Sequence, residues 1–116
     1  MSETVKHTSD IIITVGLNEE RVPVSLDWKA EDDGQQQRAA KAMLLSLFDE
    51  ESKETLKIDL WTNEMQVIEM DRFFFQTLRA LADTYFKATQ NAELATNMQQ
   101  FVQFFGEKTG IIQKKP

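Results

Sequence analysis

The chain has 116 residues, a length typical of one domain, with 41% hydrophobic and 28% charged residues. It contains no cysteine, which excludes a disulfide framework, a thiolate zinc site, an iron–sulfur cluster and a cysteine nucleophile. Its formal net charge of −6 makes nucleic acid and anionic membrane surfaces poor partners, because both are bound mainly through Lys and Arg.

The first ten residues, MSETVKHTSD, lack the apolar core of a signal peptide. No apolar run in the chain approaches the ~20 residues that a membrane-spanning helix needs. The sequence therefore predicts a soluble, cytoplasmic protein with no membrane insertion, and residues 1–7 are expected to form an N-terminal tail.

Two strands are expected near the N-terminus. Thr8–Leu17 is rich in β-branched residues, and Val22–Lys29 alternates apolar and polar side chains with the period of two that is typical of a half-buried strand. The short polar connection that begins at Asn18 predicts a hairpin. Pro23 has no amide hydrogen to donate. Its strand is therefore expected either to lie at the edge of a sheet or to make no hydrogen bond from the backbone nitrogen of residue 23.

The middle of the chain is predicted to form a loop, a helix and a third strand. Glu31–Gly34 is acidic and ends in glycine. Gln35–Phe48 contains good helix formers, with apolar residues at helical spacing. Lys53–Thr62 alternates again and is expected to be a strand.

Two further helices are predicted. The first begins near Val67–Glu69 and ends near Ala88, and Asn91 is expected to cap the second, which ends at Gly106 or Gly110. Each helix carries an apolar stripe that is expected to be buried. On the first helix the stripe comprises Met70, Phe74, Leu78, Leu81 and Tyr85, and on the second Leu94, Met98, Phe101, Val102 and Phe105.

The expected order is β-β-α-β-α-α, which predicts an α+β fold of two layers, with a three-stranded sheet covered by helices. The third strand could pair in parallel or antiparallel orientation. No linker or internal repeat divides the chain, so we expect a single domain over residues 1–116, with a core at about 8–109 and a tail at 111–116.

The sequence offers few groups for catalysis. His7 is the only histidine and lies in the expected tail, and no glycine-rich phosphate loop is present. Three acidic clusters lack the spacing of a calcium loop. The expectation is a protein that is not an enzyme and has no catalytic residues, no metal ligands and no cofactor. The clusters begin at Glu19, Glu31 and Asp49.

An alternative function would use acidic residues on the face of the sheet. Asp27 and Asp59 lie on the polar faces of two expected strands, and a close carboxylate pair can perform acid–base chemistry when one pKa is raised. The protein would then be an enzyme or a binder of a small ligand. The simpler expectation is that each carboxylate pairs with a nearby lysine, such as Lys29 or Lys57, because like charges opposite each other destabilise a sheet.

Three aromatic residues lie off the expected buried stripes and are candidates for binding a partner: Trp61, Phe73 and Phe104. Three consecutive phenylalanines sweep 200° around a helix, so one core cannot easily bury them all. Each could pack beneath a neighbouring element, or belong to an exposed apolar patch for a partner protein or a second copy of the chain.

The chain resembles the GldC family of gliding-motility proteins from about Lys6 to Thr109. The resemblance rests on blocks in fixed order, of which Ala40–Asp49, AKAMLLSLFD, and Glu54–Met65, ETLKIDLWTNEM, are the most specific. KHTSDIIITVGL, RVPVSLDWKA and FFFQTL complete the pattern, while the region of Gln66 lacks the proline-containing link expected there. The resemblance implies an accessory factor of bacterial gliding motility without known enzymatic activity, whose partners belong to the gliding machinery.

Overall fold

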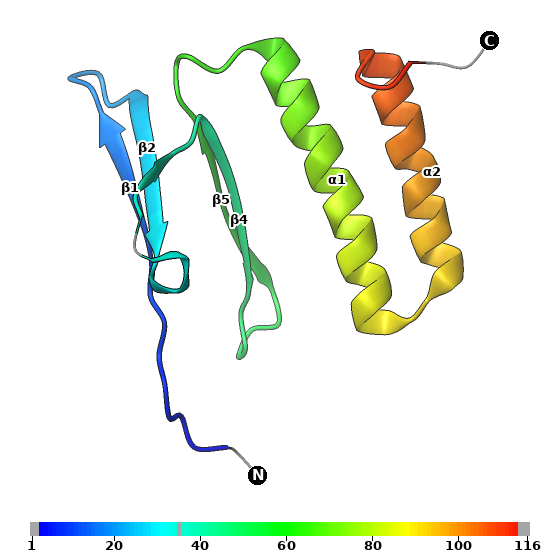
Figure 1. Ribbon diagram of the computed structural model, residues 1–116, viewed down its shortest axis with the longest axis horizontal. Coiled ribbons are helices and arrows are strands. Elements are labelled where there is room, and N and C mark those ends of the chain that lie inside the picture. The colour runs from blue at the N-terminus through cyan, green and yellow to red at the C-terminus, as the bar shows by residue number, and fades with distance from the viewer. Residues whose placement is uncertain (1–2, 35, 114–116) are drawn as a thin grey trace. The chain divides into compact units, whose positions relative to one another are not determined.

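The computed structural model describes residues 3–34 and 36–113 and confirms the α+β class, with two small antiparallel sheets and two helices (Figure 1). The contacts divide the chain into two compact units. We call Met1–Met65 the strand unit and Gln66–Pro116 the helical unit. The single domain and the covering of a sheet by helices stay predictions.

The strand unit begins with the expected hairpin. β1 (Ile11–Leu17) pairs antiparallel with β2 (Pro23–Ala30). The connection closes around Asn18, whose Oδ1 accepts hydrogen bonds from the amides of Glu20 and Val22 at 2.9 and 3.0 Å. An Asn side chain that bonds the following backbone is a common way to fix a turn.

The third strand of this sheet is not the expected one. β3 (Arg38–Ala39) pairs with β2, which makes β2 the central strand, so the expectation that Pro23 marks an edge strand was wrong. Pro23 is tolerated because it is the first residue of β2, where a strand can lack an amide donor, while its carbonyl accepts a hydrogen bond from the amide of Asn63. Arg38 fixes β3: its guanidinium lies 5.9 Å from the Trp28 ring and 2.8 Å from the carboxylate of Asp33 in the turn η1 (Glu31–Asp33).

The helix predicted over Gln35–Phe48 was wrong. The second half of this segment forms β4 (Ala42–Phe48), which pairs antiparallel with β5 (Thr55–Trp61) in a two-stranded sheet. Pairing with β5 overrides the helical spacing of the apolar residues, because it places three apolar pairs on one face. Those pairs are Met43 with Leu60, Leu45 with Ile58, and Leu47 with Leu56.

The element order is therefore β1-β2-η1-β3-β4-β5-α1-α2 rather than β-β-α-β-α-α. The Asn63 amide, just after β5, donates to the Pro23 carbonyl of β2 at 3.1 Å and so links the two sheets of the strand unit. The Ala40 amide donates to the Leu26 carbonyl and the Thr62 amide to the Lys41 carbonyl, each at 2.8 Å, and these bonds extend the pairing within each sheet toward the same junction. Leu26 and Thr62 are both 3% exposed, so this junction is the buried part of the unit.

The turn between β4 and β5 is organised by Asp49. Its carboxylate accepts a hydrogen bond from the Ser52 amide at 2.8 Å. This bond, with further ones from the Ser52 hydroxyl and the Glu51 backbone, lowers the pKa of the Asp49 carboxyl below its ordinary value, because it favours the charged form.

The helical unit contains the two helices that the sequence predicts. α1 (Val67–Thr89) and α2 (Ala92–Thr109) run in opposite directions and are joined by a short turn (Figure 1). Asn91 caps α2 as expected, accepting a hydrogen bond from the Leu94 amide at 3.1 Å. The Glu69 carboxylate accepts a hydrogen bond from the Gln66 amide at 3.0 Å, which stabilises the start of α1.

The two helices approach most closely at Gly106. A Cβ atom built there would lie 2.7 Å from the Phe75 ring and 2.6 Å from Ile112, so any larger residue requires these side chains to shift. Ile112 reaches this position because its amide donates to the Gly106 carbonyl at 3.0 Å. Ile111 and Ile112, at the start of the predicted tail, are partly buried.

We expect Gly106→Ala to lower the free energy of unfolding by about 1–3 kcal/mol, since the added methyl group overlaps a packed ring. Gln100→Ala, at an exposed position of the same helix, is the control. Urea denaturation measures both variants. A Gly106→Ala protein as stable as the control would show that the contact relaxes freely.

We expect the Asp49 carboxyl to titrate with a midpoint below about 3.9, the ordinary value for aspartate. Because the pKa is depressed in the folded state, the associated stability is present above the unfolded pKa and is lost as pH falls through the folded pKa. Carboxyl NMR measures the midpoint. Asp49→Asn should flatten the acid limb of the stability curve, and an unchanged acid limb would contradict the expectation.

Candidate functional site

Each helix of the helical unit buries one narrow stripe. The stripe on α1 contains Phe75 and Ala82, and the stripe on α2 contains Ala95 and Val102. In both helices the two residues lie seven positions apart, which returns to nearly the same side of a helix. These stripes form the contact between the two helices.

The residues directly before these four buried positions are all large and apolar. They are turned about 100° from the buried stripe, and on antiparallel helices the same offset brings them to the same side of the hairpin. Between 39% and 52% of each side chain is exposed. They are Phe74, Leu81, Leu94 and Phe101.

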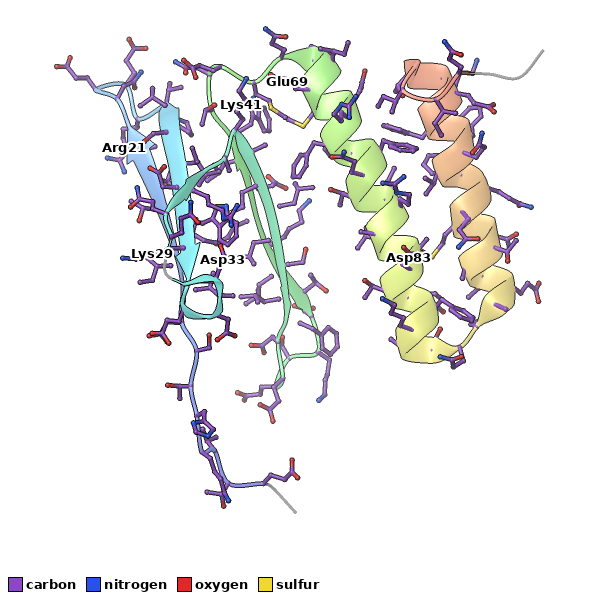
Figure 2. The ribbon with its side chains drawn as sticks, in the orientation of Figure 1. Arg21, Lys29, Asp33, Lys41, Glu69 and Asp83 are labelled. Carbon is purple, nitrogen blue, oxygen red and sulfur yellow. The ribbon has the colours of Figure 1, made fainter. Side chains whose placement is uncertain are left out.

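The residues directly after the four buried positions lie on the opposite side, and all of them are polar and exposed: Gln76, Asp83, Thr96 and Gln103. Figure 2 shows Asp83 among them, on α1. This side also has a hollow of about 320 Å³, where Arg79 lies 5.3 Å from the ring of Phe75. The helical hairpin thus has one apolar and one polar side.

The apolar side ends in a cluster of aromatic rings on α2. The ring centre of Phe101 lies 6.1 Å from that of Phe104 and 6.2 Å from that of Phe105. Lys108 places its ammonium group 5.9 Å above Phe104. We define the apolar helical face as Phe74, Leu81, Leu94, Phe101 and Phe104.

The structure distributes the three candidate residues over the two units. Phe104 belongs to the apolar helical face and is 52% exposed. Phe73 is half-buried next to Phe74, with ring centres 6.3 Å apart in an edge-to-face arrangement. Trp61 ends β5 in the strand unit and is also exposed, on the same side as Lys57 and Asp59. A role for these residues in binding a partner stays a prediction.

Sequence reasoning missed most of the apolar helical face. It assigned Phe74, Leu81, Leu94 and Phe101 to the buried stripes, whereas all four are exposed. The useful signal was the width of the stripes: each helix carries more large apolar residues than one neighbouring helix can cover.

The carboxylates of the alternative function lie in different sheets. Asp27 is on β2, opposite Thr14 and Ala39, whereas Asp59 is on β5. Asp59 forms an ion pair with Lys57 at 2.9 Å, as the simpler expectation has it. β2 and β5 are not paired, so the neighbouring strands that motivated a carboxylate pair are not formed.

Asp27 instead lines a hollow of about 380 Å³ at the junction of the two sheets, together with Lys41, Thr62 and Glu64.

Within residues 3–34 and 36–113, no three acidic or histidine side chains gather closely enough to hold a metal ion. Over the same residues, no helix has the length and apolar character required to cross a membrane.

Comparison with known proteins places the chain in a family. The sequence pattern described as "Gliding motility-associated protein GldC-like" matches residues 23–111. Comparisons with curated proteins and with solved structures find no match. Because the matched segment covers most of the 116 residues, the chain belongs to the GldC-like family of gliding motility-associated proteins.

Proposed function

We propose that this protein is a non-enzymatic, cytoplasmic accessory factor of bacterial gliding motility that acts through protein–protein contacts. The observation that carries the proposal is the apolar helical face. It is exposed, it is rich in phenylalanine, and it belongs to a chain of a gliding motility-associated family.

The composition of this face is that of an interface centre. Interface cores are enriched in aromatic residues and depleted of charge, and a few buried aromatic anchors commonly supply most of the binding energy. Phe101 and Phe104 are such anchors, because about half of each side chain is exposed. Fully burying a side chain of this size stabilises by about 1.5–3 kcal/mol, so each half-exposed ring offers roughly half of that.

The arrangement also favours a protein over a small polar ligand. The face extends over both helices and includes no carboxylate, so an apolar groove or the apolar side of another helix would match it. We therefore expect the partner, a component of the gliding machinery, to present such a surface.

The test compares variants on either side of one buried residue. Phe101→Ala and Gln103→Ala flank Val102 and alter the apolar and polar sides respectively. In a strain lacking the wild-type protein, Gln103→Ala should restore spreading over a surface, whereas Phe101→Ala should fail or restore it only weakly. Immunoblotting and circular dichroism verify that both variants accumulate and fold.

The partner itself can be captured from lysate of the native organism. The wild-type protein and the Gln103→Ala variant should retain the same protein, and Phe101→Ala should lose at least tenfold of it. Equal retention by all three, or full motility of the Phe101→Ala strain, would contradict the proposed surface. A deletion strain that moves like its parent would contradict a role in motility.

A second candidate function is the binding of a small ligand in the junction hollow. Its volume of about 380 Å³ lies in the range of small-molecule sites, and Asp27 and Glu64 supply carboxylates beside Lys41 and Thr62. Asp27→Asn should then abolish the thermal stabilisation produced by an active compound from a metabolite panel. Asp59→Asn, in the other sheet, is the control, and a panel without any stabilising compound would count against this function.

A further inference from the structure

The outer edge of β1 is a second surface with a defined chemistry. The sheet order β1-β2-β3 places β1 at an edge, and in the described part of the chain no strand pairs with its other side. An edge strand presents unpaired amide and carbonyl groups that can bind another strand. β1 is seven residues long, so it offers a full strand length for such pairing.

Natural proteins usually protect such edges with charged residues, proline or a very short strand. β1 has none of these: its sequence is IIITVGL, and the nearest charged residues are Asp10 and Glu19. Ile11 is 70% exposed and Ile12 49%. Its only irregularity is a shift in its pairing with β2 at Gly16 and Leu17.

We propose that β1 pairs antiparallel with β1 of a second copy of this chain, around a two-fold axis at Thr14. This register joins two three-stranded sheets into one sheet of six strands. The register follows from the sequence of β1. When two identical antiparallel strands are related by a two-fold axis, each residue lies opposite the residue at the same distance on the other side of the axis, so these two residues must be compatible.

The strand is self-complementary around Thr14. Ile13 lies opposite Val15 of the second copy, and Ile11 lies opposite Leu17. These four positions share one side of the strand, because side chains alternate, so apolar residues meet apolar residues. The register also pairs all seven residues of β1, which no other centre does.

Charge favours a second copy at this edge. A chain with a net charge of −6 repels its own copies over most of its surface. β1 brings no charged residue to the contact, and the flanking Asp10 meets Asn18 of the second copy rather than another carboxylate. Two copies can therefore approach here without like charges facing each other.

The first experiment measures mass by sedimentation equilibrium. The wild-type protein should reach twice 13.4 kDa at micromolar concentrations. Thr14→Lys should weaken the dimer at least tenfold, because it places two ammonium groups opposite each other across the axis. Thr14 is exposed and lies opposite Asp27 on β2, so a lysine there has a favourable neighbour within its own chain and should not disturb the fold.

The second experiment tests the register by cross-linking, which the absence of cysteine makes unambiguous. In Thr14→Cys the two thiols lie opposite each other, with Cα atoms about 4.5–5.5 Å apart, within reach of a disulfide. The matched control is Ile12→Cys, on the same strand and side, whose copies would be offset by roughly 13 Å along the strands. Mild oxidation should link the Thr14→Cys variant at least tenfold faster.

The proposal would be overturned by a wild-type protein that stays monomeric up to about 100 μM, by a Thr14→Lys variant that dimerises as tightly as wild type, or by equal cross-linking of the two cysteine variants. A heterologous protein that binds β1 while the chain stays monomeric would also overturn it. The variants leave the apolar helical face unchanged, so this result is independent of the motility test.

Discussion

The contact between Phe75 and Gly106 determines what the helical unit presents to its surroundings. Because a glycine allows α2 to approach the Phe75 ring, the two helices meet along narrow stripes that small residues complete. Together with the buried residues Ala82, Ala95 and Val102, this contact defines which side of each helix faces the other. Every residue before a buried position is then turned to one side and every residue after it to the other, which creates an apolar and a polar side from a single packing interaction.

The strand unit follows a related constraint through a different geometry. Its two sheets are linked by the backbone hydrogen bond from the Asn63 amide to the Pro23 carbonyl, and the buried residues Leu26 and Thr62 lie at that junction. A two-stranded hairpin can bury its apolar face only against something else. The β4–β5 hairpin places all three of its aliphatic pairs on one face, while Lys57 and Asp59 form an ion pair on the other.

The sequence correctly predicts the elements in which the spacing of apolar residues fits only a strand or only a helix. Val22–Lys29 alternates strictly, and both helices have long stripes with polar caps such as Asn91, so these elements were confirmed. Residues 40–48 fit two periods, since Met43, Leu44 and Leu47 suit a helix while Met43, Leu45 and Leu47 suit a strand. The pairing with β5 decides between them, and a local pattern does not contain that information. The sequence also placed Phe104 outside the buried stripe of its helix, as observed. It did not decide whether Phe101 or Val102 faces α1, because that choice depends on the packing between the helices and not on the local pattern.

The order of the two units along the chain has a consequence for biosynthesis. The strand unit leaves the ribosome first, and the helical unit follows it only after several seconds at roughly 5–20 residues per second. The strand unit that emerges first carries the aliphatic face of the β4–β5 hairpin, with Leu47, Leu56 and Ile58 more than half exposed, and such apolar surface is what chaperones bind on emerging chains. The acidic turn at Asp49–Glu51 lies at the tip of the same hairpin and places negative charge beside this apolar face, which favours solubility of the emerging chain.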